Sequence, residues 1–308
     1  MPSFIRRGRG LPAFAAATVA VMVAVILWGA VVRITSSGGG CGSHWPLCNG
    51  DFFPHHPRVA TIIEFTHRAT TGICSTLALL VLAWTFLADT TKRARIAAVV
   101  SVFLLFVEAF LGRALVIHGY VENNISDARS IMQCVHFTNT MLLLAAFTLT
   151  WWWLRDEDPT VTPTSAQKPL AVAAILLTLI VGATGSVAAL ADTLFPSPSL
   201  SAALASDFAA NAPLLVRMRW MHPAAFVLAC IAIVWLCLRV RMRTASVVTA
   251  LLALQFVLGA GDVLFLAPWW MQVLHLLGAD LFWIALVVLA SESVQTRSAA
   301  IAKDASPK

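Results

Sequence analysis

The sequence has little charge. Only 12% of its 308 residues are Asp, Glu, Lys or Arg and 59% are apolar, whereas a soluble domain has roughly 25% charged and 45–50% apolar residues. This scarcity excludes a soluble globular enzyme and a disordered chain. The net charge of +6 does not indicate a nucleic-acid partner, because the basic residues occur in short clusters between long apolar runs. Such clusters beside apolar runs are typical of integral membrane proteins.

Tyr and Cys are also scarce. The single Tyr contrasts with 11 Trp, and Trp is a residue that bilayer interfaces favour. The six Cys are too few and too scattered for a small disulfide-stabilised scaffold. Both counts fit a membrane protein.

Eight apolar runs are long enough to cross a bilayer, which takes about 20 residues per helix. We predict transmembrane helices over residues 11–32, 61–88, 96–116, 131–153, 170–191, 214–238, 244–266 and 270–291. The first run is too long for the apolar core of a signal peptide, and no A-x-A cleavage pattern ends it, so we expect it to be retained. The sequence therefore predicts an all-α, multi-pass integral membrane protein.

The basic residues indicate the orientation of these spans. Lys and Arg cluster before the first span, after the eighth, and in the connections 2–3, 4–5 and 6–7. Because basic loops stay on the cytoplasmic side, we expect both termini to be cytoplasmic. Residues 154–169 then form a cytoplasmic linker and residues 292–308 a cytoplasmic tail.

The two halves of the chain carry similar landmarks in the same order. The matched pairs are Gly29 with Gly182, His67 with His222, Glu108 with Gln255, and His136 with His275. Because the repeat is four helices long, an even number, both halves have the same orientation. We predict two pseudo-symmetric four-helix bundles, residues 1–153 and 170–291, related by an axis near the membrane normal.

Four histidines lie at a common depth, roughly 8–12 Å below the outer surface, on alternate spans. They are His67, His136, His222 and His275. An imidazole in hydrocarbon is costly and usually marks a function. A facing pair of neutral imidazoles in a four-helix bundle suits the two axial positions of a haem iron. We therefore predict one haem site in each half; interhelical hydrogen bonds of the four side chains are the alternative.

Further ionisable residues lie near these histidines. Glu64 precedes His67 by one helical turn, so both project from the same face; it is either a functional carboxyl or an interfacial residue paired with a basic neighbour. Arg68 and Arg219 either bind haem propionates or extend from the helix ends toward the interface. The remaining ionisable groups of the spans, to which the sequence assigns no role, are Glu108, Arg113, Asp262 and Asp280.

Cys41 and Cys48 lie in the loop after the first span, on the side of the membrane where disulfides persist. A short disulfide is the favoured interpretation, and we expect it to be exposed and for that reason redox-active. A metal site with His44 and two free thiols are the alternatives. The other four Cys lie within spans and indicate packing positions.

The sequence Glu64-Phe-Thr-His67-Arg68 resembles the Glu-x-x-His-Arg signature of the haem A synthase family. The Gly29-Ala30-Val-Val-Arg33 exit from the first span is similar to that family, as is the loop from Cys41 to Cys48. The plan of eight spans and four histidines extends the resemblance along nearly the whole chain.

The resemblance implies a membrane oxidoreductase of the bacterial inner (plasma) membrane. It would oxidise a methyl group of haem O to a formyl group by successive hydroxylations, giving haem A for terminal cytochrome oxidases. The resemblance also implies Glu64 as the catalytic carboxylate and a Cys41–Cys48 disulfide. Its implied haem ligands are His67 and His136 for the substrate haem O, and His222 and His275 for a permanent haem b. The implied partners are the haem O synthase that supplies the substrate and an electron acceptor.

Other functions would use some of the same residues. A di-haem b-type electron-transfer cytochrome would explain the four histidines, but it gives no role to Glu64, which Arg219 replaces at the matching turn before His222. A haem transporter would explain Trp151-Trp152-Trp153, although an aromatic belt at the cytoplasmic interface explains this segment better. An ion transporter would need ionisable groups across the bilayer, whereas these gather near one face.

Overall fold

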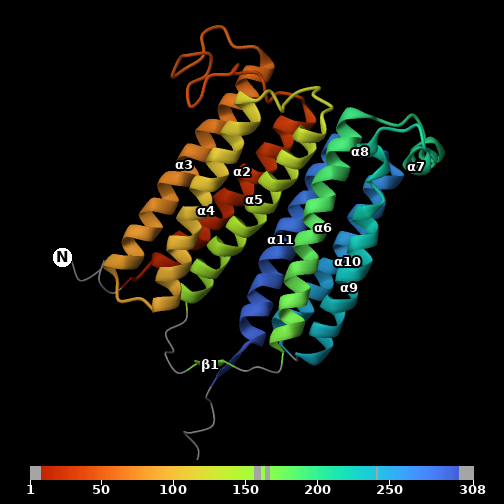
Figure 1. Cartoon of the computed structure of the whole chain (residues 1–308). Coiled ribbons are helices and arrows are strands. Elements are labelled where there is room, and N and C mark those ends of the chain that lie inside the picture. Colours follow the sequence, from red (N-terminus) through yellow and green to blue (C-terminus); the bar gives the residue numbers. More distant parts are fainter. Residues whose placement is uncertain (1–7, 156–160, 164–166, 241, 298–308) are drawn as a thin grey trace, which may run out of the picture.

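The computed structural model describes residues 8–155, 161–163, 167–240 and 242–297, which fold into long, nearly parallel helices (Figure 1). The helices are α2 (Leu11–Ile34), α3 (Val59–Leu87), α4 (Lys92–Ile117), α5 (Asp127–Leu154), α6 (Lys168–Leu194), α7 (Leu200–Phe208), α8 (Leu214–Arg217), α9 (Met221–Arg239), α10 (Arg243–Leu264) and α11 (Trp269–Ser293). Within the described residues, eight helical segments are long and apolar enough to cross a membrane, with α8 and α9 together forming one of them. The prediction of a helical protein with eight spans is confirmed.

The sixth span differs from the prediction of one continuous helix over residues 214–238. Helix α8 ends at Arg217, and α9 begins only at Met221. Pro223 lies in the first turn of α9, where its missing N–H costs nothing. A continuous helix would instead bring its ring against the carbonyl group of Arg219. The predicted span is therefore confirmed, but its helix is interrupted at residues 218–220.

Each set of four spans forms a ring of contacts. In the first set, α2 packs on α3, α3 on α4, α4 on α5, and α5 on α2. In the second set, α6 packs on α9, α9 on α10, α10 on α11, and α11 on α6. Helices α2 and α5 contact α6 and α11, so these four helices form the interface between the sets.

The core lies along this interface. Leu143 of α5 and Leu286 of α11 are fully buried. The outer faces are apolar as well, since Phe103, Phe106 and Phe110 of α4 are 64%, 65% and 62% exposed. A helix that is apolar on all sides is suited to contact with lipid.

The two ends of the bundle carry different structures (Figure 1). The long loop between α2 and α3, together with α7, lies at one end, drawn uppermost. At the other end, β1 (Val161–Pro163) pairs antiparallel with β2 (Gln295–Arg297). The predicted linker and tail therefore meet in a short two-stranded ribbon, which the sequence analysis did not predict.

Candidate functional site

Each of the four predicted histidines packs against a glycine of the preceding span. A Cβ atom added at Gly29 would lie 3.1 Å from Cε1 of His67, and one at Gly185 would lie 2.9 Å from Cε1 of His222. The same contact recurs with 3.7 Å at Gly112 facing His136 and 3.3 Å at Gly259 facing His275. A side chain at any of these glycines would meet an imidazole, so the glycines determine how closely the histidines approach the neighbouring helix.

This contact corrects one pair of the sequence repeat. Gly29 was matched with Gly182, but the glycine that faces His222 is Gly185, one turn later. Gly182 instead faces Met141 of α5. The sequence match relied on a Gly-Ala dipeptide, which occurs at Gly182, whereas Gly185 is followed by Ser.

His222 and His275 form a close pair. Their ring centroids are 6.3 Å apart and their planes are nearly perpendicular, at 86°. Nδ1 of His222 lies 3.0 Å from the carbonyl oxygen of Val181. Because a carbonyl only accepts, Nδ1 carries the proton and Nε2 keeps its lone pair for a metal.

The dimensions of this pair fit a haem iron. With metal–nitrogen bonds of about 2 Å, two axial imidazoles have centroids about 6 Å apart. Nδ1 of His275 is buried and has no hydrogen-bond partner among the described residues. A buried polar atom without a partner is costly, so a hydrogen bond at Nδ1 does not account for this imidazole. Its separation from His222 fits metal binding through Nε2.

His67 and His136 form the corresponding pair in the first set of helices. Each side chain packs against a glycine of the preceding span, His67 against Gly29 and His136 against Gly112. Nδ1 of each is buried without a hydrogen-bond partner in the described part of the chain. These residues also fit a haem, since two imidazoles come from α3 and α5 at the positions that His222 and His275 occupy in α9 and α11.

Glu64 is buried beside this pair, with 3% of its surface exposed. One carboxylate oxygen accepts the backbone N–H of Cys41 at 2.7 Å, and the other accepts two N–H groups of Arg68 at 2.6 and 3.1 Å. Glu64 thus makes both a helix-face ion pair and a contact with the outer loop.

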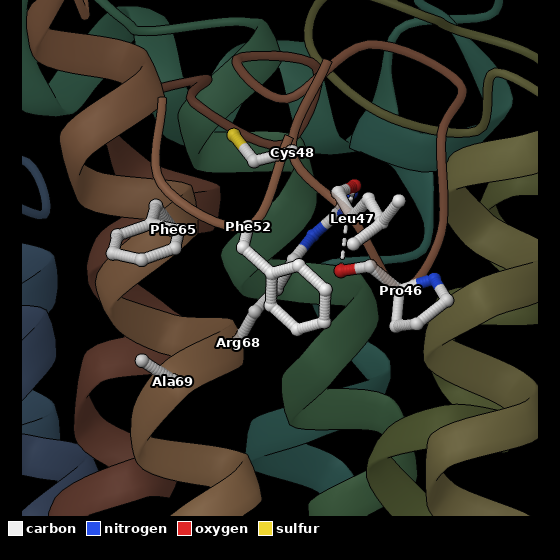
Figure 2. A pocket seen from close by; sticks show the side chains of 7 residues that line it. All are labelled: Pro46, Leu47, Cys48, Phe52, Phe65, Arg68 and Ala69. Atoms are coloured by element: carbon white, nitrogen blue, oxygen red, sulfur yellow. Dashed lines mark hydrogen bonds between the residues drawn. The ribbon is translucent and has the colours of Figure 1, made fainter. Parts of the chain in front are cut away.

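Arg68 extends from α3 into the same loop (Figure 2). It donates to the carbonyl oxygens of His44 and Leu47, each at 2.7 Å. The loop and α3 enclose a pocket of about 290 Å³. Its lining residues are Pro46, Leu47, Cys48, Phe52, Phe65, Arg68 and Ala69. The guanidinium is directed at loop carbonyls, and its predicted contact with a haem propionate stays a prediction.

Cys41 and Cys48 form a disulfide. The two cysteines are 0% and 2% exposed, so the expectation of an exposed disulfide was wrong. The loop packs back on α3 through Glu64 and Arg68, and this packing covers the sulfur atoms. Among the described residues no group of three or more His, Cys, Asp or Glu could hold a metal ion, which does not favour a metal site with His44.

Arg219 occupies the turn before His222. It donates to Asp192 at 2.9 Å and to Asp207 at 2.7 Å, and also to the backbone of Ala203 and to Ser206. These contacts attach α7 to the helices below it. Arg219 therefore fixes α7, as Arg68 fixes the loop between α2 and α3. Its predicted contact with a haem propionate also stays a prediction.

Two features of the site were missed by the sequence analysis. Arg33 of α2 crosses to the second set of helices and donates to Ala189, Thr193 and Gln272 at 2.6, 2.5 and 2.9 Å. Glu108 of α4 lies 3.4 Å from Nδ1 of His136. The signal for both was an ionisable residue inside an apolar run, but the partners lie far away in the sequence.

Comparison with known proteins identifies the family that the sequence resembles. The COX15-CtaA family model, described as "Cytochrome oxidase assembly protein", matches residues 13–287. Over 283 residues the chain is 38% identical to "Protoheme IX farnesyltransferase" of Thermus thermophilus, covering 89% of this chain and 46% of that protein. It is 32% identical over 207 residues to "Heme A synthase" of Bacillus pumilus, covering 62% of this chain and 64% of that protein. The chain thus spans about half the length of the Thermus relative.

Proposed function

The chain belongs to the COX15-CtaA family of cytochrome oxidase assembly proteins, the haem A synthase family, and we propose that it oxidises a methyl group of haem O to a formyl group. The observation that carries this proposal is an asymmetry between two otherwise similar histidine pairs. A buried carboxylate, Glu64, lies one turn before His67, whereas an arginine, Arg219, lies one turn before His222. The two pairs favour two haems, and the carboxylate favours chemistry in one half only.

We assign the substrate to the half that holds the carboxylate. His67 and His136 would hold the substrate haem O, and His222 and His275 would hold a resident haem b. Haem b supplies one-electron redox chemistry when bound. The Nδ1 hydrogen bond of His222 to Val181 orients this ligand as expected for a permanent cofactor.

The reaction proceeds through two hydroxylations of one substrate methyl group, and the resulting geminal diol loses water to give the formyl group. Overall, the methyl carbon gains one oxygen atom and loses two hydrogen atoms. With water as the oxygen donor, this change releases four protons and four electrons, and an electron acceptor outside this chain takes up the electrons. Glu64 accepts protons released at the methyl carbon. Arg68 and the N–H of Cys41 hold its carboxylate in place.

We further propose that the two sets of helices are related by a pseudo-twofold axis near the membrane normal. Exchanging α2, α3, α4 and α5 for α6, α9, α10 and α11 reproduces every contact within the rings and between them, which supports this symmetry. Both termini then lie on the cytoplasmic side of a bacterial inner membrane. The basic residues at the β1–β2 end support that orientation: Lys92, Arg93, Arg155, Lys168, Arg239 and Arg243.

The Thermus relatives suggest where the substrate originates. They are named for farnesyl transfer to protohaem IX, but this chain aligns with only 46% of their length. We attribute the transfer to the part that this chain does not match. An enzyme of that class supplies haem O to this chain.

Haem analysis tests the function. The protein is expressed with and without a haem O source, and the extracted haems are separated by chromatography. We expect haem A only when haem O is supplied, and none from Glu64→Gln. Glu292→Gln is the matched control, because Glu292 accepts a hydrogen bond from Thr244 at the opposite end of the bundle.

Each other outcome contradicts the proposal in its own way. Haem b alone, in the presence of haem O, would favour an electron-transfer cytochrome. A protein without any haem would exclude both functions. Unchanged haem A formation by Glu64→Gln would remove the catalytic role of the carboxylate.

A further inference from the structure

Glu108 of α4 makes a second asymmetry between the histidine pairs. Its Oε1 lies 3.4 Å from Nδ1 of His136, just beyond an ordinary hydrogen bond. Its carboxylate accepts two further hydrogen bonds from α5, one from Asn139 at 2.6 Å and one from the hydroxyl group of Thr140. The side chain is mostly buried, with 13% exposed. The carboxylate is therefore held in place beside the imidazole.

The second set of helices lacks this arrangement. The residue at the position of Glu108 is Gln255, whose amide donates to the backbone carbonyl of His275 at 3.3 Å. Gly278 and Ala279, three and four residues after His275, stand where α5 has Asn139 and Thr140. Neither has a side-chain hydrogen-bond donor, and Nδ1 of His275 has no hydrogen-bond partner in the described residues. The carboxylate and both of its anchors thus occur in one half only.

A carboxylate beside the outer nitrogen of a metal-binding imidazole has a known physical effect. The carboxylate accepts a hydrogen bond from the Nδ1–H group, orients the ring and makes the imidazole a more basic ligand. A more basic imidazole stabilises ferric iron relative to ferrous iron, which lowers the reduction potential. Hydrogen bonds from Asn139 and Thr140 occupy the remaining lone pairs of Glu108 and limit its rotation.

We propose that Glu108 is a positioning residue that accepts a hydrogen bond from Nδ1 of His136 when Nε2 of that imidazole binds a haem iron. The haem between His67 and His136 then has a lower reduction potential than it would have without the carboxylate. This inference rests on the proposed function only to the extent that both histidine pairs bind haem. It assigns Glu108 a role distinct from that of Glu64, which contacts the outer loop.

The test is a redox titration of the purified, full-length protein. The probe is ferric protohaem, loaded on both pairs, and the two haems are followed by optical and paramagnetic resonance spectra. His136→Ala identifies the component that belongs to the first pair. For Glu108→Gln we expect the preference of this haem for the ferric state to fall about 10- to 100-fold. Its reduction potential would then rise by about 59 to 118 mV, since a tenfold change corresponds to about 59 mV for one electron.

Two further variants separate tuning from a structural role. Thr140→Val removes one anchor of the carboxylate, and we expect a smaller shift in the same direction. Gln255→Ala is the matched control, because the side-chain amide of Gln255 donates to the backbone carbonyl of His275 and not to its ring. It should leave the potential of the first component unchanged.

The inference is overturned if Glu108→Gln moves the first component no more than Gln255→Ala does, or if it moves both haems equally. If Glu108→Gln releases the haem, Thr140→Val decides, and an unchanged potential there overturns the inference. Failure to load the first pair with haem also overturns it. Haem A formation is measured separately, so a selective shift without haem A leaves this inference standing while the proposed function fails.

Discussion

A glycine opposite each histidine is the smallest unit of this site. Gly185 and Gly29 belong to helices that would otherwise favour alanine, since glycine in a helix interior costs about 0.5–1 kcal/mol. That cost is offset where a Cβ atom would meet an imidazole. Such a glycine keeps space for the imidazole ring that packs against it.

Gly185→Ala should therefore lose haem from the His222–His275 pair. The added Cβ would lie 2.9 Å from Cε1 of His222, which forces the ring to move and weakens its hydrogen bond to Val181. We expect the ratio of haem to protein, measured by pyridine haemochrome absorbance, to fall by about half.

Gly72→Ala is the matched control. Nothing lies within 4 Å of a Cβ atom at Gly72, which is also inside a helix. This variant should keep its haem and become slightly more stable, by about 0.5–1 kcal/mol. Equal haem loss in both variants would show that the glycines act only through helix stability.

At the scale of elements, a buried ion pair attaches the outer loop to α3. Arg68 joins Glu64 of its own helix to the carbonyl groups of His44 and Leu47 in the loop. The Cys41–Cys48 disulfide belongs to the same loop, and both of its cysteines are buried. Loop, disulfide and carboxylate thus form one unit.

Arg68→Lys should loosen this unit without unfolding α3. A lysine keeps the charge, but its single ammonium group cannot reproduce the fork of a guanidinium. We expect faster hydrogen exchange at the backbone N–H of Cys41 and a higher yield of thiols at a given concentration of reductant. Arg58→Lys, at the exposed N-cap of α3, should change neither. Unchanged exchange in Arg68→Lys would mean that the loop is held by other contacts.

The elements that the sequence predicted are those with a local signal. The spans follow from apolar runs, and the depth of His67 follows from its position in one of them. The break before α9 also has a local cause, because the ring of Pro223 would meet the carbonyl group of Arg219 in a continuous helix. The contacts of Arg33 with Ala189 and Gln272 have no local cause, because their partners are chosen by the packing of helices far apart in the chain. The turn that places Gly185 opposite His222 could not be chosen from the dipeptide alone.

At the scale of the whole molecule, Arg33 connects the two sets of helices. Its three hydrogen bonds reach α6 and α11 from the end of α2. A hydrogen bond to a charged group contributes about 1.5–3 kcal/mol, and buried acceptors that lose it add a penalty. The connection lies at the same end as the histidine pairs, so a shift of one set against the other would affect both.

Arg33→Met should lower the unfolding temperature in detergent by several degrees. The shift follows from a loss of about 2 kcal/mol or more, at roughly 2–4 °C per kcal/mol. Arg113→Met is the control, because Arg113 is exposed near the same end of α4, and a surface change should stay within about 0.5 kcal/mol. Equal unfolding temperatures for both variants would show that Arg33 adds nothing to the interface.

The proposed orientation of the molecule rests on the distribution of its charge, and labelling of single cysteines tests it. Asn123 lies in the exposed loop between α4 and α5, and Lys92 is exposed at the opposite end of α4. Cys41 and Cys48 are joined, but four thiols remain: Cys74 is buried, whereas Cys134, Cys230 and Cys237 are partly exposed. The labelling variants are therefore made in a background in which these four cysteines are replaced by Ser. With the termini cytoplasmic, a membrane-impermeant maleimide should label Asn123→Cys in cells with an opened outer envelope. It should label Lys92→Cys only after the inner membrane is permeabilised. The reverse pattern would place the histidine pairs near the cytoplasmic face, where the Cys41–Cys48 disulfide would be exposed to reducing thiols.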